Sequence, residues 1–429
     1  MISRVLSADL PEHVGERVTI AGWLHRRRDL KSVTFLIIRD RAGLAQVVLR
    51  AGDETAGEET VLHVEGLVVA SPQAPGGVEL TEPVVIQLSR PAQPPPFDLY
   101  RPAVTAALPT ILDHAPATLR HPQLRAGFEV AAASAAGFRT ALDRAGFTEI
   151  FTPKIVGTAT EGGANVFSID YFGRPAYLAQ SPQFYKQAMV GVFERVYEVG
   201  PAFRAEPHDT ARHLAQYTSL DAEFGFITDH FDVMAVCRDA VAGMADSVRE
   251  RASSAMQFLA AKLPEVPAQI PYLHFSEAMA LIGAATGEDI TEEPDLAPAH
   301  ERWLCQWAQR EHGSELVFVT GYPLHSKPFY TYPDPRRPRY SYGFDLLFRG
   351  TEIVTGGQRL HRHEDYLQAL AARGMDPVPF AGFLQVFSHG MPPHGGFAIG
   401  LERWTARLTG AANVRQVTLF PRDLHRLSP

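Results

Sequence analysis

The chain has 429 residues, 45% hydrophobic and 21% charged, which is the composition of an ordinary globular protein with room for two domains. A formal net charge of −8 excludes a protein that grips nucleic acid over its whole surface, but it leaves room for a local basic site. Its two cysteines, Cys237 and Cys305, exclude a disulfide framework and a cysteine zinc site. Because neither a bilayer-spanning apolar run nor an N-terminal signal pattern occurs, we expect a cytoplasmic protein without a membrane partner.

The first hundred residues predict short β-strands separated by turns rich in glycine, proline and aspartate. The predicted strands are 18–24, 33–38, 45–49, 62–69 and 78–88. Such a set of short, β-branched strands is typical of a small closed or nearly closed β barrel. Residues 91–122, with three consecutive prolines and scattered alanines, predict a linker with little periodicity. We therefore expect a barrel domain at 1–98, a hinge at 99–120 and a second domain at 121–429.

The second domain opens with a predicted helix that ends at Gly146. Helical spacing separates its apolar residues Leu124, Phe128, Ala132, Ala135, Phe138 and Leu142. Strands and helices then alternate irregularly, without the rhythm of a doubly wound sheet, and no phosphate loop or dinucleotide fingerprint occurs. The predicted fold class is therefore α+β, with helices flanking an antiparallel sheet.

The most informative segment runs from Phe203 to Phe226. Strand alternation assigns its second half to two faces, Tyr217, Ser219, Asp221 and Glu223 on one and Thr218, Leu220, Ala222, Phe224 and Phe226 on the other. Before the loop, Arg204 and Glu206 also share a face. The polar surface could hold a nucleotide, with arginine on phosphate, a ring on the base and carboxylates on an amine or a metal. On pattern alone, a half-exposed strand with solvated charges is an equal alternative.

Residues 396–404 predict a strand of small residues that runs into a helix. Leu401, Trp404 and Leu408 would face inward, while Arg403 lies on another side near the helix start. Such a start, preceded by Gly400 and bearing an arginine, is a natural phosphate site. Taken alone, a glycine-packed helix with an exposed arginine is the simpler interpretation.

Three segments resemble the motifs of class II aminoacyl-tRNA synthetases in order and spacing. Gly146–Pro153 resembles motif 1, Phe203–Glu223 motif 2 and Gly400–Trp404 motif 3, and the resemblance covers almost the whole chain. It implies that Arg204 and Arg403 are catalytic. The implied ATP-binding residues are Arg204, Glu206, Arg212, His213, Leu214, Tyr217, Glu352, Gly400 and Arg403.

The segment Ala179–Gln187 resembles the aspartate-binding stretch of the aspartyl-tRNA synthetases. The resemblance implies six aspartate-binding residues, Glu161, Gln183, Lys186, Ser219, Asp221 and Arg359. Glu161 belongs to a stretch, residues 160–164, similar to the mobile loop that closes over the amino acid; a plain surface turn is the alternative. Lys186 and Arg359 would face the side-chain carboxylate and form a doubly positive pocket, which disfavours neutral asparagine.

Asp345 and Glu352 flank a predicted hairpin turn at residues 349–351. In the family these positions bind the Mg²⁺ ions that hold the ATP phosphates, so the turn would bring both carboxylates to one metal. His361 and His363 have His-x-His spacing, but no third ligand stands out in the sequence. We therefore expect a structural or nucleic-acid-facing role for them and no zinc.

The predicted barrel carries a dense basic cluster within Gly22–Leu30. It resembles the anticodon-binding OB-fold of the aspartyl, asparaginyl and lysyl enzymes, in which a ring stacks a base and an amide reads its edge. The implied anticodon-binding residues are His25, Arg26, Arg28, Phe35, Gln46, Pro75 and Glu79. For the barrel alone, a solvated arginine turn beside a core phenylalanine is the alternative.

The resemblance as a whole is to compact, archaeal-type aspartyl-tRNA synthetases, which load L-aspartate onto tRNA(Asp) with ATP. His25 and Pro75, expected in barrel loops, resemble the pattern of relaxed members that also charge tRNA(Asn) and feed a tRNA-dependent amidotransferase. Because motif 1 normally forms the dimer interface of this class, we expect a homodimer. The alternatives are an asparaginyl-tRNA synthetase, an ammonia-dependent asparagine synthetase and a non-enzymatic tRNA-binding paralogue.

Overall fold

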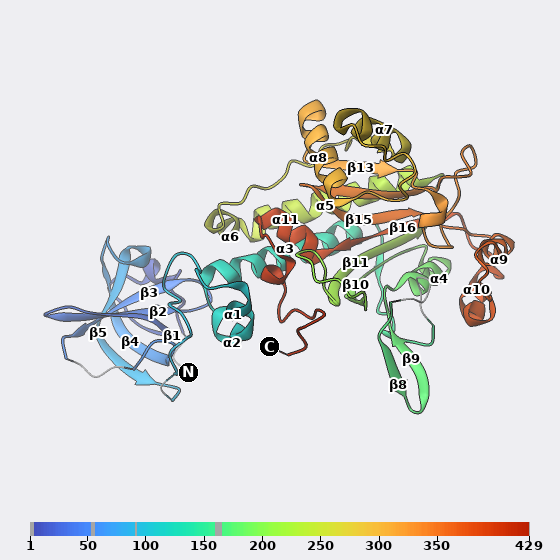
Figure 1. Ribbon diagram of the computed structural model, residues 1–429. Helices are drawn as coiled ribbons and strands as arrows, with labels where there is room; N and C mark the ends of the chain where they lie inside the picture. The colour runs from blue at the N-terminus through green and yellow to red at the C-terminus, as the bar shows by residue number, and fades with distance from the viewer. Residues whose placement is uncertain (1–3, 53–55, 91, 159–164, 429) are drawn as a thin grey trace. The chain divides into compact units, whose positions relative to one another are not determined.

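A computed structural model describes residues 4–52, 56–90, 92–158 and 165–428 (Figure 1). The chain forms two compact units, Met1–Pro122 and Gln123–Pro429. In the described residues, no helix combines the length and the apolar character that crossing a membrane requires.

The first unit is built on a closed five-stranded barrel, which confirms the barrel predicted from the sequence. The order around the barrel is β1-β2-β3-β5-β4, and β1 closes it by pairing antiparallel with β4. The strands are β1 (Arg17–Asp29), β2 (Val33–Arg39), β3 (Leu44–Arg50), β4 (Val61–Ala70) and β5 (Val78–Gln87). Alternate residues such as Leu62, Val64 and Val68 fill the interior, because successive side chains of a strand point to opposite faces.

The segment expected to be a linker contains two short helices, α1 (Leu108–Asp113) and α2 (Ala115–Thr118). Each has a proline in its first turn, where the missing N–H costs nothing. The Thr118 hydroxyl donates a 2.7 Å hydrogen bond to the Ile111 carbonyl, and this tertiary link joins the two helices. The sequence has too little periodicity here to reveal them.

The second unit is built on an eight-stranded sheet of order β12-β13-β14-β15-β16-β11-β10-β6 (Figure 1). Its six central strands pair antiparallel, as predicted, but the edge strands β12 and β6 pair parallel to their neighbours, so the sheet is mixed. The strands are β12 (Tyr272–His274), β13 (Leu316–Thr320), β14 (Gly343–Phe348), β15 (Thr351–Gln358), β16 (His394–Gly400), β11 (Gln216–Gly225), β10 (Arg195–Phe203) and β6 (Thr148–Glu149). A separate three-stranded sheet contains β7 (Ile155–Val156), β9 (Arg174–Leu178) and β8 (Ser168–Tyr171).

The large core lies between this sheet and the helices α3 (Pro122–Arg144), α5 (His230–Arg251) and α11 (Leu401–Thr409). The backbones of α3 and α5 touch, because a Cβ added at Gly137 would lie 2.4 Å from the Gly243 carbonyl oxygen. Trp404 is fully buried, stacks on Phe348 and donates to the Ser134 hydroxyl at 2.9 Å. The predicted inward face of α11 is confirmed.

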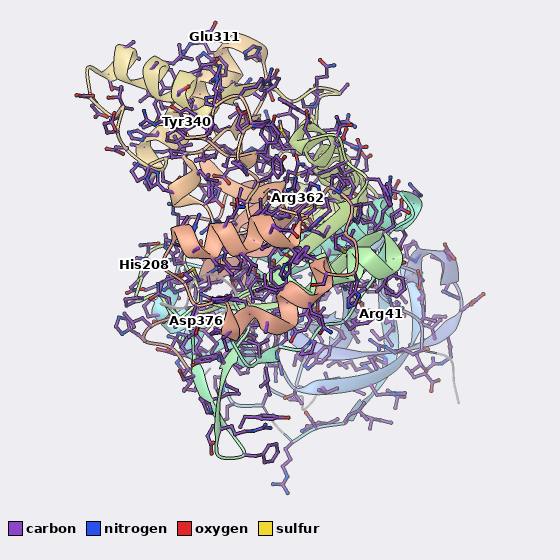
Figure 2. The ribbon with its side chains drawn as sticks, turned by 90° about the vertical axis from the view of Figure 1, so that its right-hand side faces the viewer. Arg41, His208, Glu311, Tyr340, Arg362 and Asp376 are labelled. Carbon is purple, nitrogen blue, oxygen red and sulfur yellow. The ribbon has the colours of Figure 1, made fainter. Side chains whose placement is uncertain are left out.

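Two further helical groups pack on or beside the sheet. The helices α7 (Phe275–Thr286) and α8 (Pro298–His312) pack with β12 and β13, and Glu311 and Tyr340 mark this part in Figure 2. An aromatic cluster joins α4 (Gln183–Phe193), α9 (His363–Ala372) and α10 (Ala381–Phe387). The first group places α8, and the second places α4, beside the polar face of the central strands. The short helix α6 (Ser253–Phe258) follows α5.

Candidate active site

Strand β11 carries the predicted alternation of polar and apolar side chains. Leu220, Ala222 and Phe224 enter the core. Ser219, Asp221 and Glu223 on the other face are also buried, but they form polar contacts with neighbouring elements. The prediction is wrong for Phe226, which lies beyond the strand end with a φ of +61° and is 73% exposed.

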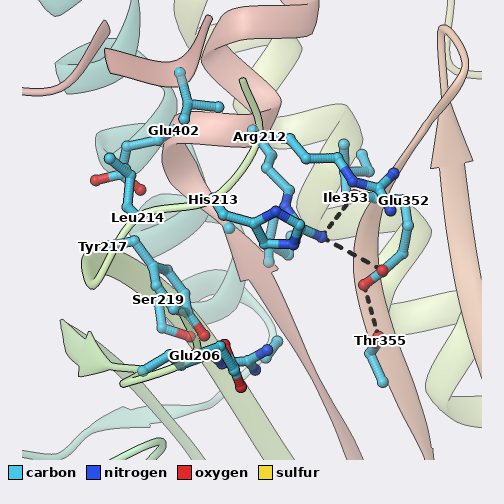
Figure 3. A pocket seen from close by; sticks show the side chains of 16 residues that line it. Glu206, Arg212, His213, Leu214, Tyr217, Ser219, Glu352, Ile353, Thr355 and Glu402 are labelled. Atoms are coloured by element: carbon cyan, nitrogen blue, oxygen red, sulfur yellow. Dashed lines mark hydrogen bonds and ion pairs between the residues drawn. The ribbon is translucent and has the colours of Figure 1, made fainter. Parts of the chain in front are cut away.

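A single cavity brings together residues from β11, the loop before it, β15, β16 and α11 (Figure 3). All nine predicted ATP-binding residues line it, with seven others that the prediction did not include: Ser219, Ile353, Thr355, Ala398, Ile399, Glu402 and Val414. Arg204 and Glu206 follow the end of β10 and so lie in the loop. The Arg204 guanidinium carbon lies 5.5 Å from the centroid of the Tyr217 ring, so a cation and an aromatic face border the same space.

Charged side chains of both signs line the cavity, namely Arg204, Arg212 and Arg403 together with Glu206, Glu352 and Glu402. Arg403, in the first turn of α11, donates through Nη1 to the backbone and side-chain oxygens of Glu352 at 3.3 and 3.4 Å. Burial, and after it the positive charges of the neighbouring Arg403 and Arg212 guanidinium groups, together lower the pKa of His213 to about 4. His213 is therefore neutral at pH 7, and the arginines supply the positive charge.

Beside this cavity, Lys186 and Arg359 converge on one buried carboxylate. Lys186 Nζ lies 2.9 Å from Asp221 Oδ1 and 3.3 Å from Glu223 Oε2, and Arg359 Nε lies 2.9 Å from Glu223 Oε1. Gln183 donates to Glu223 at 3.4 Å. The structure therefore brings the predicted aspartate residues of the described chain into one network, which Ser219 joins through a 2.5 Å hydrogen bond to Asp221.

The prediction that this pocket carries a double positive charge is wrong, because the carboxylates of Asp221 and Glu223 offset the charges of Lys186 and Arg359. Burial acts to raise the pKa of Glu223, but Arg359 and Lys186 overcome it and hold the pKa below its ordinary value. Both cations are thus already paired. Strand alternation predicts the face on which Glu223 lies, but no sequence pattern indicates that Glu223 pairs with both cations. Glu161, also predicted here, lies outside the described residues.

The β14–β15 hairpin positions Asp345 and Glu352. Its turn is Arg349-Gly350, both with positive φ, and Thr351 already belongs to β15. The pKa of Asp345 is raised to about 6; burial is the largest cause, the Lys327 charge opposes it, and the nearby Glu352 charge acts in the same direction as burial. Lys327 Nζ lies 3.3 Å from Asp345 Oδ2, a contact that the sequence did not indicate.

No three His, Cys, Asp or Glu side chains of the described chain gather into a group able to hold a metal ion. The two histidines of the His-x-His spacing lie in different surroundings. His361 stacks against Tyr332, with 6.2 Å between ring centroids, while His363 begins α9.

Comparison with known proteins identifies the family of this site. A family described as class II tRNA synthetases for D, K and N matches residues 109–424. The chain belongs to this family. A second family, described as OB-fold nucleic acid binding domains, matches residues 18–87 and therefore the barrel.

Relatives of this synthetase match over its whole length. It is 48% identical to the Aspartate–tRNA(Asp/Asn) ligase of Thermus thermophilus over 99% of this chain and 100% of that protein. It is 37% identical to the Aspartate–tRNA(Asp) ligase of Thermococcus kodakarensis over 99% of both. Among solved structures, asparaginyl-tRNA synthetase from Pyrococcus horikoshii, complexed with asparaginyl-adenylate, is 31% identical, with a TM-score of 0.91 and 100% coverage of both chains.

The barrel of the synthetase joins four of the predicted anticodon residues. The Arg28 guanidinium carbon lies 5.7 Å from the Phe35 ring centroid, and Arg28 donates to the Gln46 amide oxygen at 3.2 Å. The Gln46 amide in turn donates to Glu79 at 2.8 Å. These residues come from four strands, so the closed barrel is what assembles them.

The prediction that His25 lies in a loop is wrong. His25 is the extra residue of a bulge inside β1, between Leu24 and Arg26, and only 4% of its surface is exposed. It contacts Arg39 at 2.8 Å, and burial followed by the Arg39 charge lowers its pKa to about 4. Arg26 lies over the Tyr100 ring, while Pro75 does lie in a turn between β4 and β5.

Two further buried acids were not predicted from the sequence: Glu402, which lines the cavity of Figure 3, and Glu301, which pairs with Arg212 of the lining. Both Glu402 oxygens accept the Thr218 backbone N–H at 3.0 Å, which ties α11 to β11. Glu301, on α8, accepts from Arg212 at 2.9 Å. Both residues act through partners far away in sequence, and no local pattern marks such contacts.

Proposed function

We propose that this synthetase is an aspartate–tRNA ligase, which forms aspartyl-adenylate from L-aspartate and ATP and transfers the aspartyl group to tRNA(Asp). The convergence of Lys186 and Arg359 beside the nucleotide cavity is the observation that carries the choice of amino acid. The names of full-length relatives support it.

The proposed first step needs no protein base. The α-carboxylate of aspartate is already ionised, and one of its oxygens attacks the α-phosphorus of ATP in line, so that the bond to pyrophosphate breaks. Arg204 and Arg403 offset the developing charge, Tyr217 stacks on adenine and Glu206 accepts from its amino group. A ribose hydroxyl at the tRNA 3′ end then attacks the mixed anhydride and releases AMP.

Selection of aspartate follows from the donors of the pocket rather than from its net charge. Lysine and arginine side chains carry only N–H donors, and the Arg359 fork fits the two oxygens of a carboxylate. An asparagine side chain would turn an amide N–H₂ group toward one of these donors and leave it without an acceptor. An asparaginyl enzyme is the rival function, because the chain is structurally similar to one.

Asp345 and Glu352 fit a magnesium ion that is shared with the ATP phosphates. Mg²⁺ takes oxygen ligands and is commonly held by one or two carboxylates together with substrate phosphates. Burial and the neighbouring Glu352 charge raise the pKa of Asp345 to about 6, so a divalent cation would stabilise the ionised pair. The metal would supply neutralisation of phosphate charge, while Arg403 orients Glu352.

We further propose that Arg28, Phe35, Gln46 and Glu79 read the anticodon. Phe35 would stack a base and Gln46 would read its edge, as in other OB-folds that bind single strands.

We also propose that the enzyme charges tRNA(Asn) and so supplies a tRNA-dependent amidotransferase, as the Asp/Asn names of several relatives suggest. Since His25 is buried in a bulge, Pro75 is the better candidate for a loop contact with the first anticodon base.

A homodimer is proposed from one exposed apolar side chain within motif 1 and another beside the helix that leads into it. Phe151, next to edge strand β6, is 84% exposed, and Leu419 is 58% exposed beside the groove that α3 lines. Light scattering after gel filtration should give twice the 47.2 kDa of one chain. A monomer mass at micromolar concentration would reject the dimer.

Charging of purified tRNAs tests the proposed activity. Radioactive aspartate should become attached to tRNA(Asp) and to tRNA(Asn). Charging of tRNA(Asp) alone would keep the ligase assignment and remove the broader tRNA specificity, whereas charging only with asparagine would overturn the proposal.

A further inference from the structure

Glu301 is a buried acid that lies outside the three motifs yet contacts two of the elements that form the nucleotide cavity. Its side chain is 4% exposed and projects from α8. Both carboxylate oxygens lie 2.9 Å from Arg212 Nη1, and Oε2 also accepts the Glu352 backbone N–H at 3.1 Å. A single carboxylate therefore links the loop between β10 and β11 to the start of β15.

Glu301 contacts the Arg212 guanidinium group through one of its three nitrogens, Nη1. The contacts of Arg212 with Glu301 all involve Nη1, and within the described chain no other side chain or backbone oxygen accepts from its guanidinium. The side chain is 30% exposed and lines the cavity close to His213 (Figure 3). Nε and Nη2 thus remain as donors for a ligand inside the cavity.

The pair is suited to hold a cation in place before a ligand arrives. A long arginine side chain loses rotamer freedom when it binds phosphate, and this loss of entropy weakens binding. If a buried partner already fixes the side chain in the folded protein, the entropy is lost during folding and no longer opposes binding of the ligand. Because Glu301 is buried, loss of its partner would leave an uncompensated charge, so Arg212 is strongly retained. The same carboxylate fixes the backbone at Glu352, which Arg403 and Thr355 also contact.

We propose that Glu301 is a positioning residue for the nucleotide step: it anchors Nη1 of Arg212 so that Nε and Nη2 face the triphosphate of ATP. Glu301 does not contact the substrate and acts through Arg212. The inference rests on the proposed function, because it takes ATP to be the ligand of this cavity.

Glu301→Gln tests the anchor with little change of shape. Glutamine can still accept the Glu352 N–H, but it lacks the charge that holds the guanidinium. In aspartate-dependent ATP–pyrophosphate exchange, the KM for ATP should rise about tenfold, the effect expected for one charge-assisted hydrogen bond. The KM for aspartate should stay within about twofold, which a general loosening of the fold would not allow.

Glu315→Gln is the matched control. Glu315 also pairs with an arginine, because Arg349 Nε lies 2.7 Å from its Oε1, but Arg349, unlike Arg212, does not line the cavity. This variant should leave both KM values unchanged. An unchanged KM for ATP in Glu301→Gln, or an equal rise in Glu315→Gln, would overturn the inference.

Combination with Arg212→Ala separates this inference from the proposed function. If Glu301 acts only through Arg212, the double variant should have the same KM for ATP as Arg212→Ala alone. Additive effects would overturn the positioning role. An unchanged KM in Arg212→Ala would instead reject the nucleotide role of Arg212 itself, and with it this inference.

Arg212→Lys supplies a test that leaves Glu301 intact. A lysine retained by Glu301 has no second nitrogen for the phosphate, so the KM for ATP should rise as in Glu301→Gln. A wild-type KM in Arg212→Lys would contradict the anchor even if Glu301→Gln failed to fold.

Discussion

Arg359 Nε lies 2.9 Å from Glu223 Oε1, and both side chains are buried. Lys186 reaches the other oxygen of the same carboxylate at 3.3 Å. Glu223 therefore holds two largely buried cations, Lys186 of α4 and Arg359 beyond the end of β15, next to each other. This arrangement preorganises donors for an acidic side chain, and the predictions below concern its parts and the elements around it.

Glu223→Gln should destabilise the protein by about 3 kcal/mol, because it removes the charge from a buried ion-pair network. Chemical denaturation should detect the loss as a lower midpoint. Glu315→Gln, which removes a partly exposed acid, should cost less than about 1 kcal/mol. Equal effects of the two substitutions would mean that burial of the Glu223 network does not matter.

Arg359→Lys should lower kcat/KM for aspartate about 100-fold in pyrophosphate exchange while it leaves the KM for ATP within about twofold. The replacement keeps the charge but loses the planar fork and with it at least one charge-assisted hydrogen bond. A rise in the KM for ATP of the same size would place Arg359 in the nucleotide site instead.

Phe35→Ala should reduce kcat/KM for tRNA about 10- to 100-fold and leave pyrophosphate exchange unchanged, since stacking of one base contributes about 1–3 kcal/mol. Val84→Ala is the control, because Val84 lies on β5 of the same barrel and is 54% exposed. It should alter neither assay. Impaired exchange in Phe35→Ala would show damage beyond tRNA binding.

The stability of the protein should fall as the pH is lowered from about 6.5 to about 4, in part because of His394. Burial lowers the pKa of this histidine to about 4 from its ordinary value of 6.5, so the unfolded chain binds its proton first. The contribution is complete above the unfolded pKa and amounts to about 3 kcal/mol. Unfolding free energies measured across this range should have a smaller slope in His394→Asn. An unchanged slope would mean that His394 does not titrate in this way.

Much of the fold could be predicted because local patterns determine it. The alternation along β11 separated Leu220 and Ala222, which enter the core, from Asp221 and Glu223. The apolar spacing of α11 likewise identified Trp404 as a core residue. The parallel pairing of β12 and β6 was not predictable, since it depends on which strands meet at the edges.

The parts of the site that escaped prediction are long-range contacts. Glu301 and Lys327 carry no local signature, and their partners Arg212 and Asp345 are brought to them only by folding. His25 was misplaced because the predicted strand ended at Leu24, whereas β1 continues to Asp29 through a bulge that buries the His25 side chain. The resemblance to the three motifs predicted which residues line the cavity, but the ion pairs among these residues and their neighbours are visible only in the tertiary structure.

Amino-acid-dependent ATP–pyrophosphate exchange, measured with aspartate and with asparagine in parallel, tests the selection of aspartate most directly. If Glu223 fixes the donors of Lys186 and Arg359 for an acidic side chain, exchange with aspartate should have a kcat/KM at least about 100-fold above that with asparagine. The Arg359→Lys variant should lose most of this preference. Equal exchange with both amino acids, or faster exchange with asparagine, would contradict the assignment of this pocket to an acidic side chain.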